Sequence, residues 1–172
     1  MEQEFLDIVN EDDEVIDRLS IDEAYRTGKW IIRSSSLFIK NSEWKLWIPR
    51  RNPWKSKFPG ALDFSAGGHV SSGETYIQWL VRESQEEINI ILNPENIRPL
   101  WKLLQNDIGY NIRFFSALYE YITDTPPSIN PKEHSESLWL TPEELYEKLL
   151  DPKEPKYKSG LKEMIERFYL TK

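Results

Sequence analysis

The chain contains no cysteine, which excludes disulfide bonds and thiolate chemistry. It has no run of about 18 apolar residues, so a membrane-spanning helix is not expected. The net charge is −7 and no basic cluster suggests binding to duplex DNA or to a membrane surface, so neither nucleic acid nor a membrane is an expected partner. The acidic N-terminal residues lack the basic and apolar regions of a signal peptide. We therefore expect a cytoplasmic protein.

The composition is that of a globular protein. Of its 172 residues, 39% are hydrophobic and seven are tryptophan, which is enough to form a substantial core. No linker, repeat or low-complexity segment divides the chain. We therefore expect one domain that spans residues 1–172.

The expected elements alternate between strands and helices. Extended runs over residues 5–9 and 15–19 flank an acidic turn, which predicts an N-terminal β-hairpin. Ser20 and Glu23 have the spacing of a capping box, which opens a short helix ending near Gly28. The other expected elements are strands over 30–39, 44–48, 97–104, 110–122 and 137–140, and helices over 75–88, 142–150 and 159–170. This order predicts an α+β fold in which a mixed β-sheet lies between helical layers.

The expected helix over residues 75–88 has two distinct faces. Its apolar residues form one stripe, which docks on a core, and its acidic residues fall in a sector roughly 130° away. Those acidic residues, Glu83, Glu86 and Glu87, lie within one helical turn and repel each other. A divalent cation with a preference for oxygen ligands relieves that repulsion, which makes the face a candidate Mg2+ site. The simpler interpretation is a solvated acidic face.

The spacing of charged residues here resembles the Nudix box. That motif is a Gly, five residues, a Glu, seven residues and then Arg-Glu-apolar-x-Glu-Glu-x-Gly-apolar. In this chain Gly68 and Glu74 have the first spacing, and Arg82 follows after seven more residues. Glu83, Glu86 and Glu87 then fill every remaining charged position, and Ile90 fills the final apolar one. The resemblance implies the α/β/α Nudix fold.

Two positions of the motif differ from the family pattern. Ser84 stands where the family has an apolar residue, on the core side of the helix, which weakens packing but leaves the chemistry intact. Asn89 replaces the final Gly, and Asn is the next-best residue for a left-handed helix C-cap. Neither difference removes a candidate metal ligand.

The resemblance implies a Mg2+-dependent hydrolase, with Mn2+ as an alternative metal, acting on a small-molecule diphosphate. The implied metal ligands are the carboxylates of Glu83, Glu86 and Glu87 and the backbone carbonyl of Gly67. Arg82 lies at i, i+4 from Glu86 and is expected to orient it. The candidates for the general base are Glu86 and the distal Glu133, with Glu136 and Glu120 as weaker rivals.

The segment before the box resembles the branch of the superfamily that contains isopentenyl-diphosphate isomerase. Arg51, Lys57 and the run Phe58-Pro59-Gly60 precede Gly68-His69 as in that branch. Isomerases also require a catalytic cysteine and several metal-binding histidines, whereas this chain has no cysteine and two histidines. We therefore predict hydrolysis of a diphosphate linkage and no isomerisation.

Other residues near the box are candidates for substrate binding. Arg51 and Lys57, together with Arg50 and Lys55, are expected to clamp substrate phosphates, although the same charges suit a solubilising loop. His69 is assigned to substrate binding, with metal ligation or a structural role as alternatives. The aromatic candidates for stacking on a base are Trp47, Trp54, Tyr76 and Trp79, all of which equally suit a core.

Two non-enzymatic interpretations remain for the chain. One is a catalytically silent nucleotide-binding or regulatory module on the Nudix fold, and the other is an acidic helical domain without metal. The complete set of charged positions argues against both. Nudix enzymes often dimerise, so a homodimer is one expectation, whereas the identity of the substrate does not follow from the sequence.

Overall fold

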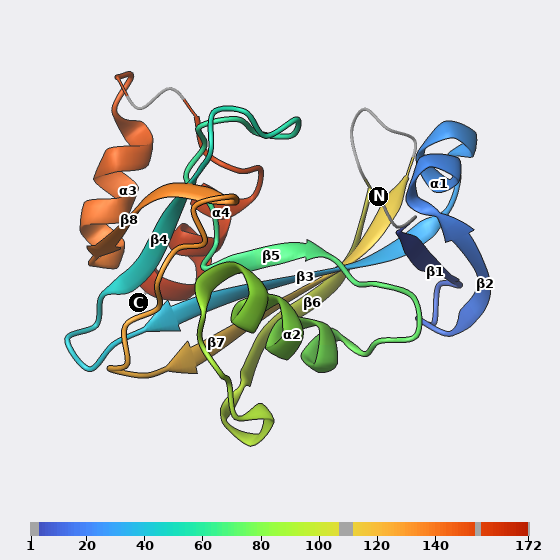
Figure 1. Ribbon diagram of the computed structural model, residues 1–172, viewed down its shortest axis with the longest axis horizontal. Helices are drawn as coiled ribbons and strands as arrows, with labels where there is room; N and C mark the ends of the chain where they lie inside the picture. The colour runs from blue at the N-terminus through green and yellow to red at the C-terminus, as the bar shows by residue number, and fades with distance from the viewer. Residues whose placement is uncertain (1–3, 107–111, 154–155, 172) are drawn as a thin grey trace.

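A computed structural model describes residues 4–106, 112–153 and 156–171. The chain begins with the expected hairpin, in which β1 (Phe5–Val9) pairs antiparallel with β2 (Val15–Ser20). The Asn10 side chain stabilises the connecting turn by accepting hydrogen bonds from the backbone N–H groups of Asp12 and Glu14. Ser20 then caps α1 (Ile21–Thr27), and the hairpin and helix form the N-terminal extension on the right of Figure 1.

The strands of the described residues form one eight-stranded mixed sheet. At its centre β3 (Ile31–Lys40) pairs antiparallel with β1, with β4 (Leu46–Arg51) and with β5 (Ala66–His69). It also pairs in parallel with β7 (Arg113–Ile122), which pairs antiparallel with β6 (Arg98–Asn106). The remaining strand, β8 (His134–Leu140), pairs antiparallel with β4.

Helices cover both faces of the sheet, as the sequence predicted. Alternate residues of β3 point to opposite faces. Leu37 and Ile39 pack in the core beneath α2 (Tyr76–Ile88), whereas Phe38 packs with α3 (Pro142–Leu150) and α4 (Leu161–Ile165). A 3₁₀ turn, η1 (Pro94–Asn96), precedes β6, and a π-helical turn, η2 (Glu166–Leu170), follows α4. No helix of these described segments is long and apolar enough to cross a membrane.

Several boundaries differ from the sequence-based expectation. β8 begins at His134 instead of Ser137, because His134 and Glu136 pair with the end of β4. The last helix begins at Leu161 instead of Ser159, because Gly160 has a φ of +83° and interrupts the helical backbone. The strand expected over 110–122 begins at Arg113, and residues 110 and 111 lie outside the described residues.

The three serines of β3 do not shorten the strand. Residues 34–36 pair with β5 on one side and with β7 on the other, so their backbone groups are satisfied within the sheet. Their small side chains also admit the glycines of β5, since a Cβ atom added to Gly67 would lie 3.1 Å from the Ser36 Oγ. This close packing positions β5 directly before the connection to α2.

Candidate active site

Helix α2 has defined caps at both ends. Thr75 and Gln78 form a reciprocal capping box at its N-terminus, and Asn89 ends the helix in the left-handed conformation with a φ of 52°. Asn89 therefore replaces the family glycine as the sequence predicted. Trp79 packs over β5, where a Cβ atom on Gly68 would lie 3.0 Å from its ring, so a larger residue at that position would force the ring to shift.

Arg82 connects the carboxylates of the box. Its Nε and Nη2 donate to the two carboxylate oxygens of Glu74 at 2.8 and 2.7 Å, while Nη1 donates to Glu83 at 2.6 Å. The expected contact with Glu86 is present but longer, at 3.2 Å. These hydrogen bonds, the one to Glu74 foremost, raise the pKa of the guanidinium further above its usual range. Sequence reasoning missed the bidentate contact with Glu74, which it named only as a position of the motif.

The loop before β8 attaches to the C-terminal end of α2. The Asn130 backbone N–H donates to the Glu87 carbonyl at 2.9 Å, and its side-chain amide donates to the Glu86 carbonyl at 3.1 Å. The Asn89 side chain donates in return to the Ser128 carbonyl at 3.0 Å. These contacts bring Glu133 within electrostatic range of Glu87.

Among the carboxylates of the box, Glu87 is the one whose negative charge is least compensated by hydrogen-bond donors. Burial, followed by the charges of Glu83, Glu133 and Asp63, raises its pKa to about 7. Glu83 is also partly buried, and burial raises its pKa despite the bond from Arg82. Within the described residues the Glu87 carboxylate accepts no hydrogen bond, unlike those of Glu83 and Glu86. The site thus carries excess negative charge around Glu87.

The region beside Gly67 contains two charged residues that the sequence analysis did not single out. Asp63 is 3% exposed and bonds to Arg51 Nη1 at 3.2 Å and to Lys158 Nζ at 3.1 Å. Lys158 Nζ also donates to the Gly67 carbonyl at 2.9 Å. Asp63 lies close to the box in the sequence, and this was the only signal that it could belong to the site. No sequence signal connects the distant Lys158 to the site.

The basic residues proposed as a phosphate clamp already have partners. Arg50 bonds to Glu136 at 2.5 Å, Lys55 bonds to Glu133, and Arg51 donates to the Lys57 carbonyl as well as to Asp63. The Lys57 ammonium lies 4.2 Å from the centre of the Tyr25 ring. A substrate phosphate would therefore have to compete with these contacts, and the clamp stays a prediction.

His69 connects the N-terminal extension to the sheet. Its Nε2 lies 2.7 Å from the Tyr25 hydroxyl, and its ring stacks on Phe114 with centroids 5.6 Å apart. Burial, with the nearby charges of Lys57 and Lys158, lowers its pKa to about 4, so the imidazole is neutral at pH 7. These contacts fit the structural alternative, and a role in substrate binding stays a prediction.

Most of the aromatic candidates for base stacking serve the core. Trp47 and Trp79 are buried in the cluster beneath α2, as the core interpretation predicted. Tyr76 donates to Asp13 at 3.0 Å and packs partly against the same cluster. Trp54 is 72% exposed and is therefore the candidate that remains accessible to a ligand.

The donor set of the box suits a hard divalent cation. As they stand, the described residues contain no group of three acidic or histidine side chains arranged to hold a metal, and Glu83 and Glu86 both bond to Arg82. The remaining donors nevertheless match the preference of Mg2+ for carboxylate and carbonyl oxygens. Glu87 lacks a hydrogen-bonding partner within those segments, and the Gly67 carbonyl already accepts from a cationic group, the Lys158 ammonium.

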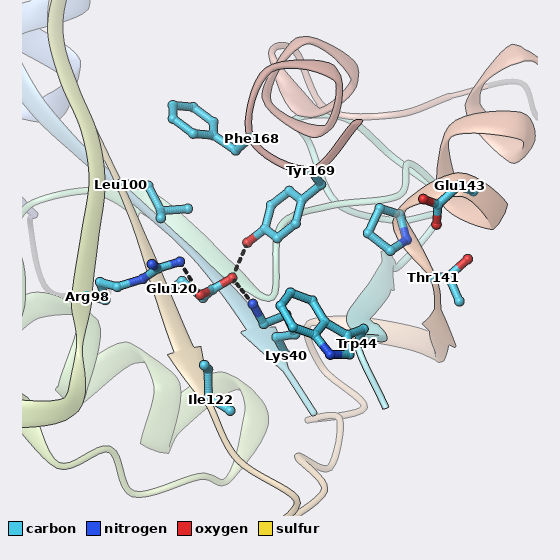
Figure 2. Close-up of a pocket in the computed structure, with 11 residues that line it drawn as sticks. Lys40, Trp44, Arg98, Leu100, Glu120, Ile122, Thr141, Glu143, Phe168 and Tyr169 are labelled. Atoms are coloured by element: carbon cyan, nitrogen blue, oxygen red, sulfur yellow. Dashed lines mark hydrogen bonds and ion pairs between the residues drawn. The ribbon is translucent and has the colours of Figure 1, made fainter. Parts of the chain in front are cut away.

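A pocket lies on the face of the sheet opposite to α2. Its volume is about 570 Å³, and Figure 2 shows the Glu120 carboxylate within it bonded to Lys40, Arg98 and Tyr169. Glu120 pairs in register with Phe38, whose side chain points away from α2. The structure therefore separates Glu120 from the box. Each of the other candidate bases has a cationic partner, namely Arg50 for Glu136, Lys55 for Glu133 and Arg82 for Glu86, so the choice among them stays a prediction.

Comparison with known proteins identifies the fold. A family model described as the NUDIX domain matches residues 31–168. An uncharacterized Nudix hydrolase of Nostoc is 43% identical over 96% of both chains, and a Nudix hydrolase of Deinococcus radiodurans is 40% identical over 96% of this chain and 94% of its own. A crystal structure of a D. radiodurans protein superposes with a TM-score of 0.79 and 38% identity, covering 96% of this chain and 99% of that one.

A more distant structure agrees in fold alone. The MutT protein of Methanosarcina mazei superposes with a TM-score of 0.62 at 20% identity, over 80% of this chain and 92% of that one. Together, the mixed sheet between helices, the capped box helix with its charged positions filled, and the match over residues 31–168 lead to one conclusion: the chain belongs to the Nudix family.

Proposed function

We propose that this Nudix protein is a Mg2+-dependent hydrolase that cleaves a diphosphate linkage in a nucleoside diphosphate derivative or a related organic diphosphate. One observation carries the proposal: α2 presents Glu83, Glu86 and Glu87 on one face, and the loop before β8 brings the charge of Glu133 to that same face. Nudix hydrolases of Nostoc and D. radiodurans, similar over nearly the whole chain, support it.

Each acidic residue has a distinct role in this proposal. Glu83, Glu86, Glu87 and the Gly67 carbonyl would hold the cation, which supplies Lewis-acid stabilisation of charge on the phosphate oxygens. Mn2+ is the alternative ion, because it also accepts oxygen ligands. Arg82 keeps the box carboxylates oriented through its bonds to Glu74 and Glu83.

Cleavage requires a base and a cationic binding site for the substrate. Water attacks phosphorus, the bond to the leaving phosphate oxygen breaks, and a base accepts the proton of the water. We assign this role to Glu133, whose charge acts on Glu87 and whose carboxylate pairs with Lys55, with Glu86 as the rival. Arg51 and Lys57 are the proposed phosphate ligands, because Arg51 ends β4 and Lys57 lies in the loop between β4 and the box.

The proposal excludes isomerase chemistry despite the likeness to that branch in Arg51, Lys57 and the following Phe-Pro-Gly run. Isomerisation of isopentenyl diphosphate moves protons to and from carbon, and the isomerases of that branch use a cysteine thiol for this step. The chain has no cysteine. Incubation with isopentenyl diphosphate and Mg2+ should therefore yield no dimethylallyl diphosphate by NMR.

The test is a substrate screen with a matched pair of variants. Purified protein is incubated with Mg2+ and nucleoside di- and triphosphates, nucleotide sugars, dinucleoside polyphosphates and non-nucleotide diphosphates, and products are identified by 31P NMR. Glu87→Gln keeps the shape of the side chain but removes its charge, and we expect a rate loss of roughly 100-fold or more with the fold intact. Glu147→Gln, an exposed residue of α3, is the control and should retain the wild-type rate.

Two outcomes would contradict the proposal. Binding of these compounds without turnover in the wild type would identify a catalytically silent module. Turnover that is equal in the wild type and in Glu87→Gln at limiting Mg2+ would remove Glu87 from the metal site.

A further inference from the structure

Lys158 places a positive charge inside the candidate metal site. Its ammonium donates to the Gly67 carbonyl at 2.9 Å, and that carbonyl is one of the four groups assigned to the cation. Its charge also lowers the pKa of Glu87, opposing the nearby carboxylates that raise it. An ammonium group and a metal ion cannot occupy the same side of one carbonyl oxygen at bonding distance.

The backbone around Lys158 is fixed, so the side chain alone has to move. The Lys158 N–H donates to the Leu62 carbonyl at 2.8 Å, and the Leu62 N–H donates to the Lys156 carbonyl at 3.1 Å. This segment forms a parallel β-bridge between Leu62 and Tyr157 beside the sheet. The flexible four-carbon stem of a lysine can change its conformation while this backbone stays in place.

Asp63 can keep the Lys158 ammonium in an ion pair after the ammonium leaves the Gly67 carbonyl. Its two carboxylate oxygens lie 3.1 and 3.3 Å from Lys158 Nζ, and the Asp63 side chain is 4% exposed. Lys158 can therefore give up the Gly67 carbonyl and keep its ion pair. The ammonium then remains close to any cation at Gly67, and the two positive charges repel each other.

On the basis of the proposed function, we propose that Lys158 competes with the divalent cation for the Gly67 carbonyl and so lowers the affinity of the site for that cation. Lys158 is a positioning residue in this role. When no cation is bound, its ammonium occupies the Gly67 carbonyl and compensates part of the negative charge around Glu87. The competition makes two measurable predictions, one for cation binding and one for thermal stability.

The first measurement is the affinity for Mn2+. It is determined at fixed ionic strength from the electron paramagnetic resonance signal of the free ion. Lys158→Met should bind Mn2+ about tenfold or more tightly, because a charge-assisted hydrogen bond no longer has to be broken and a repulsive charge is gone. Lys156→Met is the matched control: it removes the same charge from an exposed side chain two residues away on the same segment. We expect it to change the affinity by about threefold or less.

The second measurement is the rise in melting temperature on adding Mg2+. Without cation, Lys158→Met should melt below the wild type, because Asp63 and the box lose a compensating charge. At the same Mg2+ concentration its melting temperature should rise more than that of the wild type, since a ligand that binds more tightly stabilises the folded state more. If Lys158→Met does not fold, Lys158→Gln keeps a hydrogen-bond donor for Asp63 and serves the same comparison.

The outcomes separate this inference from the proposed function. If the wild type binds Mn2+ and Lys158→Met or Lys158→Gln binds it equally or more weakly, Lys158 does not compete and the inference is wrong, while the hydrolase proposal stands. An equal gain in affinity in Lys156→Met would mean that the effect comes from general charge, and it would also overturn the inference. If neither the wild type nor the variants bind Mn2+, both the metal site and the competition are wrong.

Discussion

At the residue scale, Arg82 decides how the acidic side chains of the box are arranged. It contacts three carboxylates and the Ser71 hydroxyl from one guanidinium group. Its planar fork matches both oxygens of Glu74, which a lysine ammonium cannot do. Because Glu74 lies before the helix and Glu83 lies on it, Arg82 joins the loop to α2.

This role predicts that Arg82→Lys will lower activity and Mg2+ affinity together. The charge is kept, but the bidentate contact is lost and Glu83 and Glu86 become free to reorient. We expect a decrease of about tenfold in each quantity, the effect of losing one charge-assisted hydrogen bond. The measurements are the initial rate as a function of Mg2+ and the affinity for Mn2+.

Arg98→Lys is the control for this substitution. Arg98 is largely exposed and lies on the opposite face of the sheet, so both quantities should stay at the wild-type level. If Arg82→Lys lowers the melting temperature and leaves activity and affinity unchanged, Arg82 has a packing role alone.

At the element scale, α2 was predictable because its signals are local. Its apolar stripe, its acidic face and the Asn89 C-cap all depend on residues within a few turns of each other. The contacts of Lys158 could not be predicted, because it bonds to Gly67 and Asp63 across 91 and 95 residues of chain. Such contacts depend on tertiary packing of the C-terminal segment.

Helix α2 also contains a local defect at Ser84. The residue is fully buried, its Oγ has no hydrogen-bonding partner in the described residues, and the family places an apolar side chain there. A buried hydroxyl without a partner costs free energy of folding. Ser84→Ala should therefore raise the free energy of unfolding by about 1 kcal/mol.

Urea denaturation measures this change. The control is Ser135→Ala, because Ser135 is exposed, and it should have little effect on the free energy of unfolding. Loss of stability in Ser84→Ala would mean that the hydroxyl has a favourable contact, such as a bound water, which the alanine removes.

At the scale of the whole molecule, the two faces of the sheet have separate tasks. The face under α2 carries the candidate active site, and the other face holds the C-terminal segment through Glu120. That carboxylate is 1% exposed, and it accepts from Lys40 at 2.9 Å and from Tyr169 at 2.8 Å. The sequence offered Glu120 as a rival base because it could not assign residues of β7 to a face.

This separation predicts that Glu120→Gln will weaken the fold and leave catalysis intact. Removing the charge leaves the buried Lys40 ammonium without its ion-pair partner, which costs roughly 3 kcal/mol. Burial raises the pKa of the Glu120 carboxyl, but the bonds from Lys40 and Tyr169 outweigh it and hold the pKa below its usual range. A carboxyl with a lowered pKa stabilises the fold above its unfolded-state pKa of about 4.5, and this contribution is lost as the pH falls through the folded-state pKa.

The test compares urea denaturation and the rate of hydrolysis in the wild type, Glu120→Gln and Arg98→Met. Arg98 also pairs with Glu120, at 2.6 Å, but its side chain is 63% exposed, so its loss should cost about 1 kcal/mol or less. The difference in stability between the wild type and Glu120→Gln should shrink at acidic pH, because the carboxyl becomes protonated there. Under conditions in which Glu120→Gln is fully folded, its rate should match the wild type. A large loss of rate in that folded variant would place Glu120 in the chemistry and contradict the assignment of the two faces.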